Sequence, residues 1–157
     1  MSGIIGGAGS KSGVVGETEL DYETGTWTAT LHCGSGGTAT LNSGYDRASY
    51  TKIGGLVTVT AWLYVNAISS PSGALSVRGL PFPNKVSGED SEYSAVSFAY
   101  LQNWSALTSG HWIEGNIGSG GSTEFTVTSS NGTTREQIAD HLQSNTMMCF
   151  SLTYIAD

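Results

Sequence analysis

The sequence of 157 residues has few charged side chains, only two cysteines and three prolines, and no long apolar run. Charged residues make up 12% of it, and the six Lys and Arg are dispersed among thirteen Asp and Glu, for a net charge of −7. Nucleic-acid surfaces need clustered cations to neutralise phosphates, so we expect no DNA or RNA partner. We also expect no membrane insertion and no export by a signal peptide, because no stretch is long enough to span a bilayer and the N-terminus lacks a basic region followed by an apolar one.

Residues that favour helices are scarce as well. Glycine reaches 22, and Ser and Thr outnumber Ala, Leu, Glu and Lys, a composition that suits short strands joined by tight turns. The length is sufficient for one domain with its own core. The composition therefore predicts an all-β sandwich or barrel.

The clearest strand signal covers residues 56–65, where apolar and polar side chains alternate. One face is aliphatic and belongs in the core: Val57, Val59, Ala61, Leu63 and Val65. The preceding Gly54-Gly55 pair supplies the turn of a hairpin with residues 48–53. Further strands are expected at Thr26–Leu31, at Tyr93–Tyr100 with Val96, Phe98 and Tyr100 on one side, and at Met148–Ile155 with Met148, Phe150, Leu152 and Tyr154 buried.

Two further features complete the expected fold. The spacing of Thr133 and Glu136 is that of a capping box, which predicts one short helix near 134–142. Counting strands and Gly-rich turns gives a jelly-roll-like β-sandwich of about eight strands. We place this domain at residues 25–157.

We expect residues 1–24 to form an extended N-terminal arm and an acidic linker. The arm repeats itself, since Ser-Gly-Ile-Ile-Gly at 2–6 returns as Ser-Gly-Val-Val-Gly at 12–16. So much glycine is entropically costly to fix, yet the β-branched pairs gain by burial. We expect the arm to order on another protein, with these anchors: Ile4, Ile5, Val14 and Val15. The alternating acids Glu17, Glu19, Asp21 and Glu23 are interpreted as a solvated face and not as a calcium site.

Aromatic residues suggest two contact surfaces. The polar face of the strand at 56–65 is too aromatic to lie wholly in water, and it predicts a subunit interface, with cover by the same chain as the alternative. This face consists of Thr58, Thr60, Trp62 and Tyr64. Trp104 and Trp112 fall near strand ends, where rings stack on sugars, but rings also plug the ends of sandwiches.

The sequence holds little that indicates catalysis. His32, His111 and His141 are far apart and show no metal-ligand spacing, so neither a metal nor a cofactor is expected. Cys33 and Cys149 lie in opposite strand phases, which disfavours a disulfide between them. The carboxylates Glu89, Asp90 and Glu92 are interpreted as a solvated loop. We expect a protein that is not an enzyme.

The segment Tyr-Thr-Lys-Ile-Gly-Gly-Leu-Val-Thr-Val at 50–59, with Ser-Gly-Ala-Leu at 72–75 and Gly-Leu-Pro-Phe at 79–82, resembles a β-sandwich module of structural proteins from tailed bacteriophages. The segment Gly-Thr-Trp-Thr at 25–28 fits the same module, and the arm is similar to the N-termini of small virion proteins of aquatic phages. Together these motifs cover the arm and roughly residues 25–82.

This resemblance implies a component of the virion, with two competing roles. A capsid decoration or cement protein would form a homotrimer on the shell and attach its arm to the major capsid protein or a neighbouring virion subunit. A tail-fibre tip or receptor-binding tail protein would attach to the tail and contact a host-surface glycan. The short single-domain chain favours the capsid role.

Overall fold

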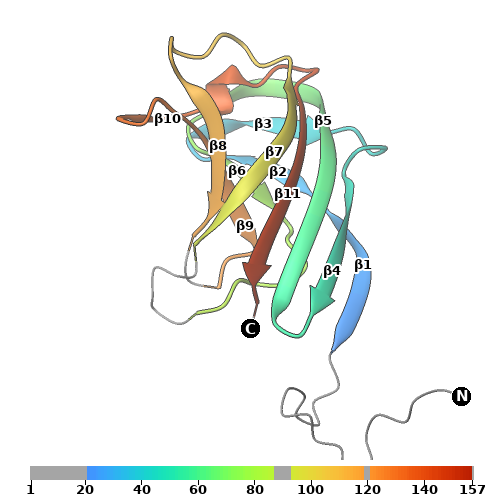
Figure 1. Ribbon diagram of the computed structural model, residues 1–157. Coiled ribbons are helices and arrows are strands. Elements are labelled where there is room, and N and C mark those ends of the chain that lie inside the picture. The colour runs from blue at the N-terminus through green and yellow to red at the C-terminus, as the bar shows by residue number, and fades with distance from the viewer. Residues whose placement is uncertain (1–20, 87–92, 119–120, 157) are drawn as a thin grey trace, which may run out of the picture.

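The computed structural model describes residues 21–86, 93–118 and 121–156, and within them the chain is all-β, as its composition predicts (Figure 1). Eleven strands and one short 3₁₀ helix follow one another within these ranges. Their bounds are β1 Tyr22–Thr28, β2 Thr30–Cys33, β3 Gly36–Leu41, β4 Arg47–Ile53, β5 Leu56–Ser72, β6 Leu75–Arg78, β7 Ser94–Gln102, β8 Trp112–Ile117, β9 Glu124–Ser130, β10 Arg135–Gln137, η2 Ala139–His141 and β11 Met147–Ile155.

The strands form one antiparallel sheet that curls into a nearly closed barrel. Its hydrogen-bonded order is β1-β4-β5-β11-β7-β8-β9-β6-β2, with β3 on β5 and β10 on β9. Two register pairs, Ser94–Ile117 and Ala95–Asn116, connect the wall β1-β4-β5-β11-β7 to the wall β8-β9-β6-β2. On the other side, the end strands β1 and β2 are consecutive in sequence, and β3 links β2 to the second half of β5.

The long strand β5 carries the core of the first wall. Its first half lies between β4 and β11, and its second half pairs with β3 (Figure 1). The predicted aliphatic face is confirmed, since all five of its side chains are buried, and so are the four predicted on β11. The Phe150 ring on β11 packs against the Phe125 ring on β9 of the opposite wall, with ring centroids 4.8 Å apart. This contact helps to hold the two walls together.

The expected hairpin is also confirmed. Ile53 pairs with Leu56 across Gly54-Gly55, and Gly54 has a positive φ of 57°, which glycine adopts at low cost.

The number of strands was underestimated. The predicted strand Thr26–Leu31 divides at Ala29, whose N–H donates to the carbonyl of Asp46, and its two parts join different walls as β1 and β2. Two further strands are β3, in a Gly-, Ser- and Thr-rich segment that predicts a loop or a short strand, and β10, where the sequence predicts a helix. The pairing describes a nearly closed barrel of eleven strands, and the jelly-roll arrangement remains a prediction.

The helix predicted near 134–142 is wrong apart from three residues of 3₁₀ helix. The Asn131 side chain accepts hydrogen bonds from the N–H groups of Thr133 and Thr134, which turns the chain so that β10 pairs with β9. Ile138 and Leu142 lie four residues apart and are both buried, as on the inward face of a helix. The same spacing therefore indicates burial here although no α-helix forms.

The wall begins at Tyr22, three residues before the predicted domain start. Asp21 pairs with Lys52 at 2.8 Å, and Glu23 accepts a hydrogen bond from the Tyr50 hydroxyl, which raises the pKa of Tyr50. Other predicted features lie outside the described residues, namely the arm anchors Ile4, Ile5, Val14 and Val15, the linker acids Glu17 and Glu19, and the loop acids Glu89, Asp90 and Glu92.

Tyr154 should make this fold less stable at alkaline pH. Its side chain is buried, its hydroxyl donates to the Phe82 carbonyl at 2.9 Å, and burial raises its pKa from 10.0 to about 12. Above pH 10 the unfolded chain loses this proton and the folded chain keeps it. The free energy of unfolding should therefore fall by about 2–3 kcal/mol between pH 10 and 12.

Urea unfolding of the parent and of Tyr154→Phe across this pH range measures the effect. The variant should start about 1 kcal/mol less stable, because the Phe82 carbonyl loses its donor, and should decline less steeply with pH. Equal slopes for the two proteins would contradict the assignment to Tyr154.

Candidate functional site

Hydroxyl side chains cover the outward face of the wall β1-β4-β5-β11-β7. Side chains directly opposite in antiparallel strands lie next to each other, so the register places them in two rows across the strands. These hydroxyl rows consist of Thr24, Thr51, Thr58 and Thr153, and of Thr26, Ser49, Thr60, Ser151 and Ser97. Within them, the Ser49 and Thr60 oxygens are 2.9 Å apart and the Thr58 and Thr153 oxygens 3.0 Å apart.

The next row along these strands is aromatic and basic. It contains Trp62 of β5, Cys149 of β11 and Tyr100 of β7, and Arg47 of β4 lies on the same face beyond the last β4–β5 pair. The Trp62 and Tyr100 rings flank Cys149, with centroids 5.4 Å apart and planes inclined by 35°. Trp62 is 48% exposed and Tyr100 39% exposed, so both rings remain available to a ligand. We call these two side chains the aromatic pair.

Tyr100 reaches this face through a β-bulge that the sequence does not reveal. Simple alternation puts Tyr100 on the same side as Val96 and Phe98. In the structure Phe150 pairs with Phe98 but the adjacent Cys149 pairs with Tyr100, so Ala99 has no partner on β11. The extra residue turns Tyr100 outward toward Trp62.

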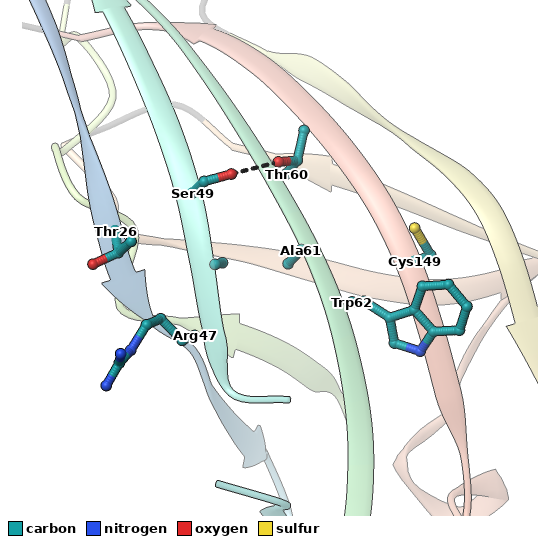
Figure 2. A pocket seen from close by; sticks show the side chains of 8 residues that line it. Thr26, Arg47, Ser49, Thr60, Ala61, Trp62 and Cys149 are labelled. Carbon is teal, nitrogen blue, oxygen red and sulfur yellow. Dashed lines mark hydrogen bonds between the residues drawn. The ribbon is translucent and has the colours of Figure 1, made fainter. Parts of the chain in front are cut away.

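A shallow trough opens beside Trp62, between β4 and β5 (Figure 2). The register of these strands ends at the Ser49–Thr60 pair, beyond which β4 continues along β1 and β5 continues along β11. The trough has a volume of about 440 Å³, and its lining is completed by Thr26, Arg47, Ala48, Ala61, Trp62 and Cys149. In Figure 2 Arg47 leans away toward β1 and Trp62 leans toward β11, which leaves only small side chains between them.

Arg47 places a positive charge at the edge of the trough. Lys52, Arg78 and Arg135 each form an ion pair with a carboxylate, whereas Arg47 forms none with any described residue. Its side chain is exposed at the edge of the trough. A guanidinium in this position can present two parallel N–H donors to an anionic group.

The residues predicted as a subunit interface all lie on this face, and the structure contains no second subunit with which to test that role. Thr60 and Trp62 are exposed, so no described segment of the chain covers them. Tyr64 is half-buried beside the Tyr45 ring, at 5.8 Å between centroids.

The predicted glycan residues do not form a common surface. Trp104 packs against the core with its indole N–H enclosed and without a described hydrogen-bond partner, whereas Trp112 on β8 is 52% exposed. Neither ring belongs to an aromatic pair among the described residues. The sequence thus indicated exposed aromatics but not which of them come together.

Two serine–histidine contacts lack the geometry of an activated nucleophile. A catalytic histidine contacts the nucleophile through one ring nitrogen and the orienting carboxylate through the other. In this protein Nδ1 of His111 faces both Ser129, at 3.4 Å, and Glu136, at 3.5 Å. His141 Nδ1 lies 3.2 Å from Ser105, and the neighbouring Asp140 accepts a hydrogen bond from the backbone of Gly73.

Metal-binding residues are not brought together either. Among the described residues no group of three or more His, Cys, Asp or Glu side chains is placed to hold an ion. Cys33 and Cys149 are both free thiols, and burial raises the pKa of Cys33. No helix in the described part of the chain is long and apolar enough to cross a membrane.

Comparison with known proteins finds a likeness among solved structures. The chain matches no protein-family model and no curated protein. Its fold is similar to part of the Dettilon tailspike protein (gp208), with a TM-score of 0.75 and 22% sequence identity. The match covers 87% of this chain and 24% of the tailspike, so the chain has the fold of about a quarter of that protein.

The wall should tolerate changes on its outward face far better than on its inward face. Trp62→Ala removes an exposed ring and should lower the free energy of unfolding by less than about 1 kcal/mol. Leu63→Ala, one residue further along β5, empties a site that is 1% exposed and should cost about 2–5 kcal/mol. Urea unfolding of both variants measures the difference, and equal losses would show that the ring is part of the folded core.

Proposed function

We propose that the protein is a structural component of a tailed-bacteriophage virion and that it belongs to the tail. The observation that carries this proposal is the fold shared with part of a tailspike, which adds to the phage-like motifs at residues 50–59, 72–75 and 79–82. The capsid decoration role becomes the second candidate, because its support is the resemblance of the arm to the N-termini of small virion proteins.

The proposed role is non-enzymatic attachment. Both histidine contacts lack the arrangement of a nucleophile and its base, whereas the outward wall offers a broad surface of hydroxyls and rings. We propose that the protein acts as a homotrimer, with residues 1–24 as the arm that attaches it to a neighbouring virion subunit. Apolar pairs separated by glycines suit strand addition, in which the backbone supplies hydrogen bonds and the side chains fill pockets.

The position of the protein on the particle tests this proposal. Gold-labelled antibodies against the domain, imaged by electron microscopy on intact virions, should label the tail. Quantitative mass spectrometry should give a copy number far below that of the major capsid protein. Label spread over the head, with a copy number close to that of the capsid protein, would instead establish the decoration role.

A truncated chain lacking residues 2–16 serves as the control for the arm. It should fold and self-associate like the parent, as judged by circular dichroism and light scattering, but fail to join virions. Incorporation at the parent's level would remove the arm from the proposal and leave the tail location intact.

A further inference from the structure

We propose that the trough and the aromatic pair together bind an acidic saccharide. This site is distinct from Trp104 and Trp112, and it is inferred from the outward wall alone, so it does not depend on where the protein sits in a virion. Three features of the wall support it: two adjacent exposed rings, a hydroxyl-lined depression and a cation without a described ionic partner.

The aromatic pair provides a stacking surface. A sugar ring has an apolar C–H face that packs on an aromatic face, and the inclined Trp62 and Tyr100 rings together form a shallow cradle over Cys149. Rings so exposed have a cost in water that burial under a ligand would remove. The Tyr100 hydroxyl donates to Gln102, which fixes the ring's direction.

The trough supplies polar contacts beside that cradle. Ser49 and Thr60 share one hydrogen bond, and each hydroxyl retains further acceptor capacity for sugar hydroxyl groups. Ala48 and Ala61 turn their small side chains toward the core and present only backbone to the trough, so no large side chain fills the space between Arg47 and Trp62. A volume of about 440 Å³ lies within the range of about 300–1,000 Å³ typical of small-ligand sites.

Arg47 selects for an acidic sugar. It stands at the edge of the trough opposite Trp62 and has no carboxylate partner in the described chain. A uronate or other carboxylate-bearing sugar stacked near Trp62 would direct its charge toward this guanidinium. The resulting bidentate contact is both stronger and more directional than a neutral hydrogen bond.

A second protein chain suits this part of the wall less well than a sugar does. Interface centres are apolar and depleted in serine, yet serine and threonine dominate here. The apolar side chains exposed on the same wall gather at its other end, beyond the hydroxyl rows. They form one cross-strand row of Tyr22, Ile53, Leu56 and Ile155.

The test uses the full chain and an array of oligosaccharides that contain uronic or sialic acids, followed by calorimetry of the bound ones. Each bound oligosaccharide is compared with its carboxyl-reduced derivative, which differs only in the charged group. We expect binding of acidic members and at least about tenfold weaker binding of the reduced forms, equivalent to about 1.4 kcal/mol.

Variants assign the binding to individual residues. Trp62→Ala and Tyr100→Ala should each weaken binding about tenfold or more, and Arg47→Gln should bind the acidic and reduced forms equally. Trp112→Ala is the matched control, because Trp112 is equally exposed on β8, and it should bind like the parent. Thermal unfolding of each variant confirms that the domain is folded.

Three results would overturn the inference. The first is that no acidic oligosaccharide binds the parent, and the second is that Trp112→Ala loses binding while Trp62→Ala keeps it. The third is that Trp62→Ala dissociates an oligomer that the parent forms, which would assign this face to a subunit interface. The first two leave the tail location untouched, because electron microscopy decides that separately.

Discussion

The pairing of β5 with β11 is the constraint on which the rest of the structure depends. Nine consecutive register pairs, from Leu56–Ile155 to Tyr64–Met147, join the two strands without a shift. Every second side chain of each strand is thereby committed to the core, where Phe150 meets Phe125 of the opposite wall. The remaining side chains must point outward whatever their chemistry, so the outward face can carry binding groups without loss of core packing.

The sequence predicts this part well because the information is local. Alternation with a period of two distinguishes the aliphatic face of β5 from its polar face, and Gly54-Gly55 indicates where the chain turns back. The set Thr58, Thr60, Trp62 and Tyr64 is therefore placed correctly on one face. The alternation along β5 does not predict what this face contacts, because the contacts depend on residues from four other strands.

Features that depend on two distant segments were missed. The β7 bulge exists only in the register between residues near 100 and near 150, so alternation along β7 alone puts Tyr100 on the wrong side. Trp62 and Tyr100 consequently form a pair that sequence reasoning did not find, whereas Trp104 and Trp112 were singled out for their position near strand ends. Tertiary strand pairing also overrides the local sequence pattern at two places. One predicted strand divides between the two walls at Ala29, and a strand forms in place of a helix after Asn131.

The contact between Trp62 and Tyr100 is the direct consequence of the β5–β11 register and the β7 bulge, and the account of the outward face rests on it. A nuclear Overhauser experiment on the aromatic protons of the labelled protein measures it. The structure predicts strong cross-peaks between the Trp62 indole and the Tyr100 ring, and none between Tyr100 and Phe150. Cross-peaks from Tyr100 to Phe150, with none to Trp62, would place Tyr100 in the core and contradict the account.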